Sequence, residues 1–188
     1  MKTRSLLVIG IVALLCASGL QAQTTTTKPW YASVSVGYAT ASWSDVKGGY
    51  GIGVAVGNVI QNHHYVEVEA IYLRHDLDEP VRWSGNFTSI PVLATYRYAI
   101  LFGASGWSLQ LGGSVGGAFQ KVKESSPYAS YSSSKTVAAL GGQALAVYKI
   151  NDTISAHAGV KSIWTDKINA GTDSGFDTMF TVGASFHF

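Results

Sequence analysis

Glu67 and Glu69 stand two residues apart and are the first candidates for chemistry, because paired carboxylates can act as general acid and base. Such a pair works only when the pKa values of its two members are driven apart. Arg97, on the neighbouring predicted strand, favours the ionised form of both glutamates. We therefore predict a structural role for them and no glycosidase-like site.

Other motifs that resemble ligand sites also have simpler structural explanations. His63 and His64 fall in a predicted turn with no evident third ligand, which indicates a solvated turn and no metal site. The glycine-rich stretches 51–57 and 112–117 lie inside alternating strands. A nucleotide loop would instead sit at a strand-to-helix turn. We expect no cofactor and no catalytic residue.

The N-terminus has the three parts of a secretory signal peptide. Lys2 and Arg4 precede the apolar run 6–15, and small residues follow up to Ala22. We expect a signal peptide over 1–22, a short tail over 23–28 and one domain over 29–188. Cys16 suggests a lipoprotein, but Leu15 stands where that pattern has a small residue.

The mature chain is expected to be uncharged overall and free of cysteine. Loss of Lys2 and Arg4 lowers the formal charge from +2 to zero, and Cys16 leaves with them. This excludes a disulfide framework, a thiol nucleophile and a basic nucleic-acid surface. Only 13% of the residues are charged, against about 25% in a typical soluble protein.

Eight segments alternate apolar and polar residues with a period of two, which is typical of strands. They cover residues 30–38, 50–57, 66–72, 89–98, 107–119, 136–148, 154–164 and 176–188. In the sixth, Leu145 and Val147 occupy the polar side, so its register is uncertain by at least one residue.

Strands of about ten residues cross a bilayer when tilted by about 45°. In lipid a sheet must close on itself, because an open edge would leave N–H and C=O groups unpaired. We predict an all-β, eight-stranded antiparallel up-and-down barrel that spans a membrane. The alternative, a soluble barrel or sandwich, requires a charged exterior. Aromatic residues near both ends of the apolar face match two interfacial girdles: Trp30, Tyr98, Trp107, Tyr148 and Phe188 at one, and Tyr38, Tyr50, Tyr72, Phe119 and Trp164 at the other.

The connections alternate between short and long. The long ones are expected over 41–48, 74–86, 121–135 and 165–175, on the outer side of the membrane. Both termini then lie in the periplasm. Exposed contacts to a host or cell-surface ligand are expected from Asp76, Asp78, Glu79, Arg82, Tyr128 and Tyr131.

The narrow lumen of eight strands must be filled by side chains. Charges buried there must be paired, because isolated burial is very costly. Glu67 and Glu69 lie on the strand next to Arg97, and Lys161 lies next to the strand that carries Asp177. We hypothesise that these five residues form an ion-pair network that plugs the barrel. A gated small pore through the same network is the alternative.

The last strand resembles the terminal strand of small bacterial outer-membrane β-barrels of the opacity type and the outer-membrane-protein-A and -X type. It alternates toward a final Phe through Phe180, Val182, Ala184, Phe186 and Phe188. Segments 89–93 and 107–116 are similar to strands four and five of those barrels. The resemblance implies a bacterial outer-membrane location among lipid and lipopolysaccharide. It also implies that the barrel-assembly machinery reads Phe188 during insertion.

The same resemblance leaves several functions open, because these barrels include structural proteins, adhesins and a few enzymes. The lipid A deacylases carry a His-x-Ser pair, and neither His75, His157 nor His187 is followed by one. We expect a non-catalytic surface protein, with adhesion through its outer loops as one role. A narrow porin-like channel for water or small ions is the alternative, and a lipid A-modifying enzyme ranks third.

Overall fold

The computed structural model describes residues 28–42, 46–77, 84–103, 105–125, 130–166 and 174–188. These residues form eight β-strands. The strands are β1 (Trp30–Ala41), β2 (Val46–Ile60), β3 (His64–Leu77), β4 (Ser84–Leu101), β5 (Trp107–Ser125), β6 (Ser130–Lys149), β7 (Ile154–Thr165) and β8 (Gly175–His187).

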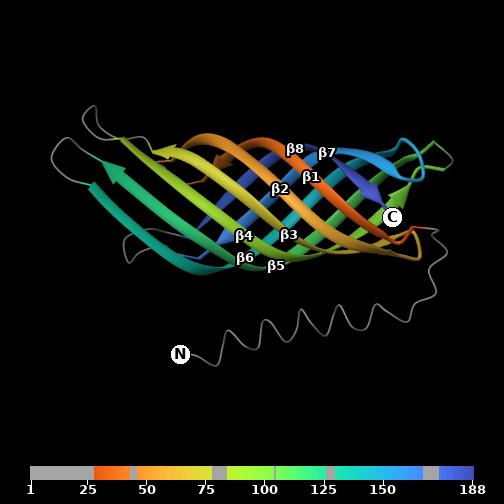
Figure 1. Ribbon diagram of the computed structural model, residues 1–188, viewed down its shortest axis with the longest axis horizontal. Coiled ribbons are helices and arrows are strands. Elements are labelled where there is room, and N and C mark those ends of the chain that lie inside the picture. Colours follow the sequence, from red (N-terminus) through yellow and green to blue (C-terminus); the bar gives the residue numbers. More distant parts are fainter. Residues whose placement is uncertain (1–27, 43–45, 78–83, 104, 126–129, 167–173) are drawn as a thin grey trace, which may run out of the picture.

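The sheet closes on itself. Each strand pairs antiparallel with the next, and β1 pairs with β8 from Tyr31↔His187 to Ala41↔Asp177. The predicted eight-stranded antiparallel barrel is therefore confirmed (Figure 1). Closure gives every strand two hydrogen-bonded neighbours, which lipid requires of a spanning sheet.

The two ends of the barrel differ. At one, here called the turn end, β1 begins, β8 ends and short connections join β2 to β3, β4 to β5 and β6 to β7 (Figure 1). Gln61 and Asn62 adopt positive φ values of 51° and 63° in the first of these turns. In the third, the Asn151 side chain accepts hydrogen bonds from the backbone N–H groups of Thr153 and Ile154, both at 2.8 Å. The opposite end is called the loop end.

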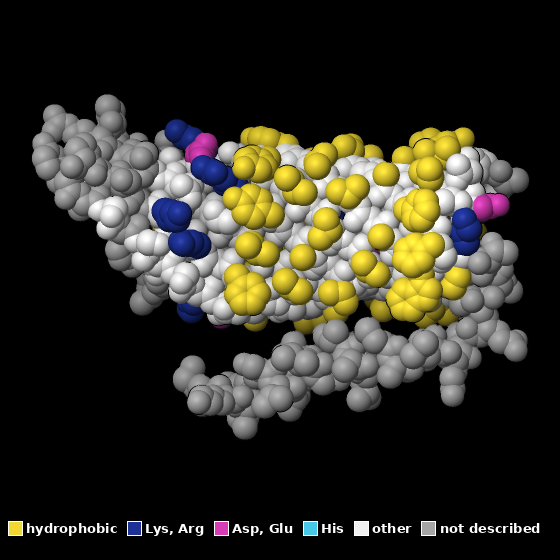
Figure 2. All heavy atoms as spheres, in the orientation of Figure 1, with side chains coloured by type: hydrophobic (Ala, Val, Ile, Leu, Met, Phe, Trp, Pro, Cys, Tyr) yellow, Lys and Arg dark blue, Asp and Glu magenta, His cyan; other side chains and the backbone are white. Residues whose placement is uncertain are grey.

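The outer wall is apolar and bounded by two aromatic rings (Figure 2). Trp30 and Trp107 are 46% and 50% exposed near the turn end, and Tyr38 and Phe119 are 58% and 56% exposed toward the loop end. The rings are separated by eight residues on β1 and twelve on β5. At about 3.3 Å per residue and a tilt of about 40°, this corresponds to roughly 20–30 Å, the height of a membrane-facing belt.

The strands are longer than the expected ten residues, from 12 in β1 to 20 in β6. Parts of the predicted loops 74–86 and 121–135 are strand, because β3 and β4 pair up to Asp76↔Asn86 and β5 and β6 up to Ser125↔Ser130. Those loop predictions are wrong at their edges. Backbone pairing does not depend on side-chain polarity, so it continues where the apolar alternation of the outer face has stopped.

The register of β6 is now defined. Leu145 pairs with Gly159 and is 1% exposed inside the barrel, and Val147 points the same way opposite His157. The weak alternation of this segment thus arises from apolar residues in the lumen and not from a slipped register. Leu145 fits there because Gly159 has no side chain.

The expected signal peptide over 1–22 and the tail up to residue 27 lie outside the described residues. Lys28 is described, and its Nζ donates a hydrogen bond to Oγ1 of Thr153 at 2.6 Å. Within the described ranges, no helix has the length and hydropathy needed to cross a membrane.

Gly159→Ala should destabilise the barrel by about 1–3 kcal/mol, because the new methyl would press into the Ala144 carbonyl and lie 2.9 Å from Cδ2 of Leu145. Gly113→Ala is the matched control, since its methyl would have only the Gly141 carbonyl oxygen within 4 Å, at 3.8 Å. Urea unfolding in detergent micelles measures both. Equal midpoints for the two variants would contradict the described β6–β7 register.

Candidate functional site

The charged residues of the lumen gather toward the turn end in a group that we call the ion-pair layer. Its members are buried, between 1% and 8% exposed, and project inward from six strands. They are Tyr31, Glu67, Glu69, Arg97, Gln110, Gln143 and Lys161.

Arg97 and Glu67 form the centre of this layer. Nη2 of Arg97 lies 2.7 Å from Oε2 of Glu67 and donates a second hydrogen bond, of 2.8 Å, to the Tyr31 hydroxyl. That hydroxyl donates in turn to the same carboxylate oxygen at 2.7 Å. The guanidinium also lies 5.9 Å and 5.5 Å from the ring centroids of Tyr31 and Tyr65. Charge, hydrogen bonds and cation–π contact together offset the loss of water around the two ions.

A second ion pair joins Lys161 and Glu69 across the lumen. Nζ of Lys161 donates a hydrogen bond to Oε1 of Glu69, and the two side chains are 7% and 3% exposed. Gln143, on β6 between the two pairs, has its Nε2 3.5 Å from Oε1 of Glu67. Four of the five residues proposed from the sequence thus lie together as two ion pairs.

The local sequence explains how these long side chains fit. Glu67 faces Gly57 on one side and Thr95 on the other, so small neighbours flank it in the wall. A Cβ on Gly57 would lie 2.6 Å from Cζ of Tyr31, which shows that this glycine provides the space for the Tyr31 ring. Tyr31 was missed by the sequence analysis, although it has the same inward parity as Ser33 and Ser35.

Beyond the ion-pair layer the lumen becomes apolar. Nine inward side chains, all 7% exposed or less, form one cluster that we call the apolar layer. It consists of Ala39, Ile71, Leu73, Leu93, Ala118, Val137, Ala139, Ile163 and Met179. Sequence analysis did not identify this layer, because it assigned inward positions to polar residues.

Asp177 lies apart from the ion-pair layer. Its register partner on β7 is Ile163, one inward position beyond Lys161, and its Oδ1 lies 3.2 Å from Nε2 of His75. Asp177 therefore pairs with His75 and lies apart from the other four residues of the predicted network. His75, expected in a loop, is an inward residue of β3 and 0% exposed, with Phe87 stacked on it at 6.0 Å between ring centroids.

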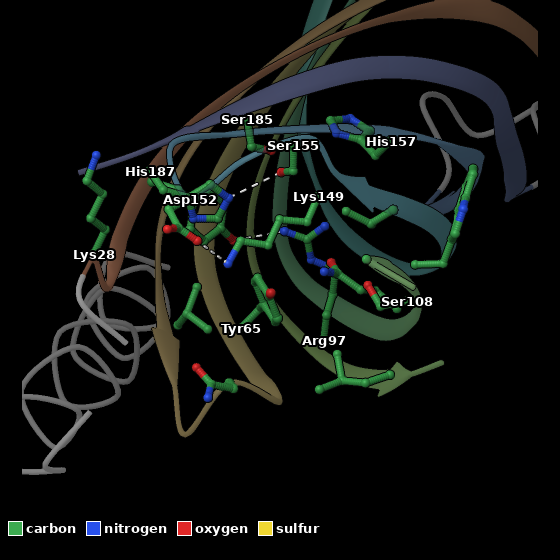
Figure 3. Close-up of a pocket in the computed structure, with 18 of the residues that line it drawn as sticks. Lys28, Tyr65, Arg97, Ser108, Lys149, Asp152, Ser155, His157, Ser185 and His187 are labelled. Atoms are coloured by element: carbon green, nitrogen blue, oxygen red, sulfur yellow. Dashed lines mark hydrogen bonds and ion pairs between the residues drawn. The ribbon is translucent and has the colours of Figure 1, made fainter. Parts of the chain in front are cut away.

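The turn end opens into a cavity of about 430 Å³ that stops at the ion-pair layer (Figure 3). Arg97 and Tyr65 point into it from β4 and β3, and Lys149 pairs with Asp152 at 2.7 Å on its rim. The Lys149 hydrogen bond lowers the pKa of Asp152. We call this cavity the vestibule. On its wall, Oγ of Ser155 lies 3.2 Å from Nε2 of His187.

A much smaller cavity lies between the two layers of the lumen. It holds about 10 Å³ and is bordered by Glu69 and Lys161 on one side and by Ile71 and Leu93 on the other. A cavity of that size is at the lower limit for one water molecule. The vestibule is lined by Tyr31, Arg97 and Gln110 of the ion-pair layer and by no residue of the apolar layer.

The remaining predicted residues fall in other places. Nδ1 of His63 lies 3.0 Å from the Ala99 carbonyl oxygen, and Nδ1 of His64 lies 2.7 Å from the Tyr96 hydroxyl. The described part of the chain contains no group of three or more His, Cys, Asp or Glu placed to hold a metal ion. Asp76 is exposed on β3. Asp78, Glu79, Arg82 and Tyr128 lie outside the described residues, and the side chain of Tyr131 is not described.

The proposed assembly signal faces outward on β8 and just beyond its end. Phe180, Val182, Phe186 and Phe188 are 52–58% exposed on the lipid-facing wall. The Phe188 backbone N–H donates to the Trp30 carbonyl at 2.9 Å, which closes the barrel at its last residue.

A family model for the outer membrane protein beta-barrel domain matches residues 9–188. The chain belongs to this family. It is an integral protein of the bacterial outer membrane, as the resemblance of its last strand implied. Among curated proteins, no sequence matches it significantly.

Solved structures share the fold at low identity. Neisserial surface protein A is 19% identical, with a TM-score of 0.65 over 85% of this chain and 97% of that one. Ail, the attachment invasion locus protein of Yersinia pestis, in complex with the heparin analogue sucrose octasulfate, is 22% identical, with a TM-score of 0.59 over 85% and 99%. A major outer membrane protein from Thermus thermophilus is 12% identical, with a TM-score of 0.53 over 84% and 99%.

Arg97→Met should lower the free energy of unfolding by about 3–5 kcal/mol, because it leaves Glu67 buried without its cation. Adding Glu67→Gln should restore most of that loss, since the unpaired charge is then gone. Lys149→Met breaks an exposed pair and should cause no measurable change. Urea titrations of all three variants test this. A double variant no more stable than Arg97→Met alone would contradict the pairing.

Proposed function

We propose that this barrel is a non-catalytic surface protein whose closed lumen supports a loop end that contacts host or neighbouring-cell surfaces. The observation that carries the proposal is the contrast between the two ends of the molecule. The lumen is filled by the ion-pair and apolar layers, whereas the strands continue as paired hairpins past the loop-end aromatic ring.

The longest hairpin is formed by β5 and β6. Past Phe119, in the loop-end ring, β5 continues for six residues to Ser125, and β6 pairs with it from Ser130. Six residues at about 3.3 Å each extend roughly 20 Å along the strand. The outward residues described on this extension are polar: Lys121 and Lys123 on β5, and Ser130, Ser132 and Ser134 on β6. Strand pairing orders the described part of this hairpin, and an ordered surface loses less conformational entropy when it binds a partner.

The orientation proposed here places both termini in the periplasm and the loop end outside the cell. The short connections at the turn end and the longer hairpins at the loop end support it. The membrane partners in this orientation are outer-membrane lipid and lipopolysaccharide around the belt. The barrel-assembly machinery is the proposed partner during insertion, through the outward face of β8.

A narrow porin-like channel is the second candidate, and the vestibule is the observation that favours it. Its volume of about 430 Å³ admits water and small ions as far as Arg97. The apolar layer beyond argues against conduction, because hydrophobic constrictions block ions by excluding water. We therefore favour the surface role.

Trimming the β5–β6 hairpin tests the surface role. Residues 122–133 are replaced by Asn-Gly, which joins the paired residues Lys121 and Ser134 through a two-residue turn. Bacteria that otherwise do not adhere would express either form, and binding to cultured epithelial cells and to matrix-coated wells would be counted. We expect the full chain to raise binding at least tenfold and the trimmed chain to lose that gain.

The control is the heat-dependent gel shift of the outer-membrane fraction, which both forms should show equally because the membrane-spanning wall is unchanged. A full chain that binds no better than the empty host would contradict the adhesive role. Equal binding by both forms would place the contact elsewhere on the loop end.

A further inference from the structure

Basic side chains line the outer wall just past the loop-end aromatic ring. Arg74 on β3 and Lys121 on β5 are exposed and share one cross-strand row through Thr88, which pairs with both. Lys123 is exposed one outward position further along, opposite Asn86 on β4. We call Arg74, Lys121 and Lys123 the basic row.

The basic row lies next to the apolar belt. Arg74 pairs with Tyr50, and Lys121 follows Phe119 on the same face of β5; these two aromatic residues belong to the loop-end ring. Figure 2 shows a cluster of Lys and Arg side chains directly beyond the large apolar side chains at this end. The cations therefore lie at the depth where an aromatic girdle gives way to lipid headgroups.

The residues between the cations are hydrogen-bonding groups. Thr88 stands between Arg74 and Lys121, and Ser134 flanks Lys121 on β6. Neighbouring strands lie about 4.8 Å apart, so Arg74 and Lys121 stand about 10 Å apart on the wall. Two cations at this spacing, with hydroxyls beside them, suit a headgroup that carries more than one phosphate.

Described carboxylates on this part of the wall do not cancel the charge. Asp76 is exposed and shares the outer row with Asn86 and Lys123, which leaves the basic row with a net positive charge. At the turn end the exposed Lys149 is instead paired with Asp152. The two membrane interfaces of the barrel thus differ in their fit to anions.

We propose that the basic row binds the phosphates of a phosphorylated glycolipid, of the lipid A type, in the outer leaflet. The lipid's acyl chains would lie along the apolar wall below Arg74 and Lys121, where Ile90 and Val92 are 38% and 40% exposed on β4. The placement in the outer leaflet rests on the orientation proposed above. The binding chemistry rests on the row alone.

The test uses the full mature chain, folded in detergent, and native mass spectrometry with added lipid. The probes are lipid A with two phosphates, the same lipid with both phosphates removed, and phosphatidylglycerol. Each cation near a membrane surface contributes about fivefold to the affinity for anionic lipid. The triple variant Arg74→Gln/Lys121→Gln/Lys123→Gln should therefore bind diphosphorylated lipid A at least twentyfold more weakly.

The controls isolate the phosphate contacts. Lys149→Gln, at the turn end, should bind like the unmodified chain, and lipid A without phosphates should bind the triple variant and the unmodified chain alike. Equal affinity of the triple variant and the unmodified chain for diphosphorylated lipid A would overturn the proposal. Tighter binding of phosphatidylglycerol than of lipid A would also overturn it, since a single phosphate would then suffice.

A sulfated polysaccharide is the competing occupant. Two results together would overturn the proposal and assign the row to sulfated polysaccharides. Heparin would bind the unmodified chain but not the triple variant, and lipid A would bind equally well with and without its phosphates. Because the chain is in detergent, the result does not depend on its orientation in cells. Loss of the adhesive role in the trimming experiment would leave this inference intact.

Discussion

Every backbone N–H and C=O group in the lipid layer must find its partner within the chain, and the rest of this structure depends on that constraint. Eight strands satisfy it by closing, with β1 against β8 over eleven paired positions. Closure with so few strands leaves an interior only wide enough for side chains. The polar residues that alternation directs inward then have no water to solvate them fully. Arg97, Glu67, Lys161 and Glu69 must therefore compensate one another.

The lumen uses two kinds of chemistry in sequence along its axis. Toward the turn end, the Arg97–Glu67 ion pair and the Tyr31 hydroxyl lie at the floor of the vestibule. Further on, Ile71, Leu73 and Met179 pack as a small hydrophobic core. The ion pairs require one geometry, because a shifted register would leave a charge buried without its partner. The apolar layer packs without such directional constraints. The ion pairs thus define the register of the strands, and the apolar layer fills the interior.

Much of this architecture follows from the sequence, because lipid imposes a period of two on each strand. The strand count, the outward faces and the inward positions of Glu67, Glu69, Arg97 and Lys161 could be predicted in this way. The pairing of Lys161 with Glu69 could not, since it crosses the lumen between β7 and β3 and joins strands that are not neighbours. The inward position of Ile71 was equally hidden, because an apolar residue satisfies either face. For the same reason, Leu145 on the polar side of its segment left the register of β6 open. Strand length past the membrane leaves no alternating signal, so the reach of the β5–β6 hairpin became visible only in the structure.

The claim on which the functional account depends most is that the lumen is closed, and single-channel recording in planar bilayers tests it most directly. The folded full chain should give no resolved conductance steps. Arg97→Ala should also give none, because the apolar layer beyond the vestibule remains in place. Stepwise conductance of the unmodified chain, raised further by Arg97→Ala, would contradict a closed lumen and identify the barrel as a narrow pore gated at the ion-pair layer.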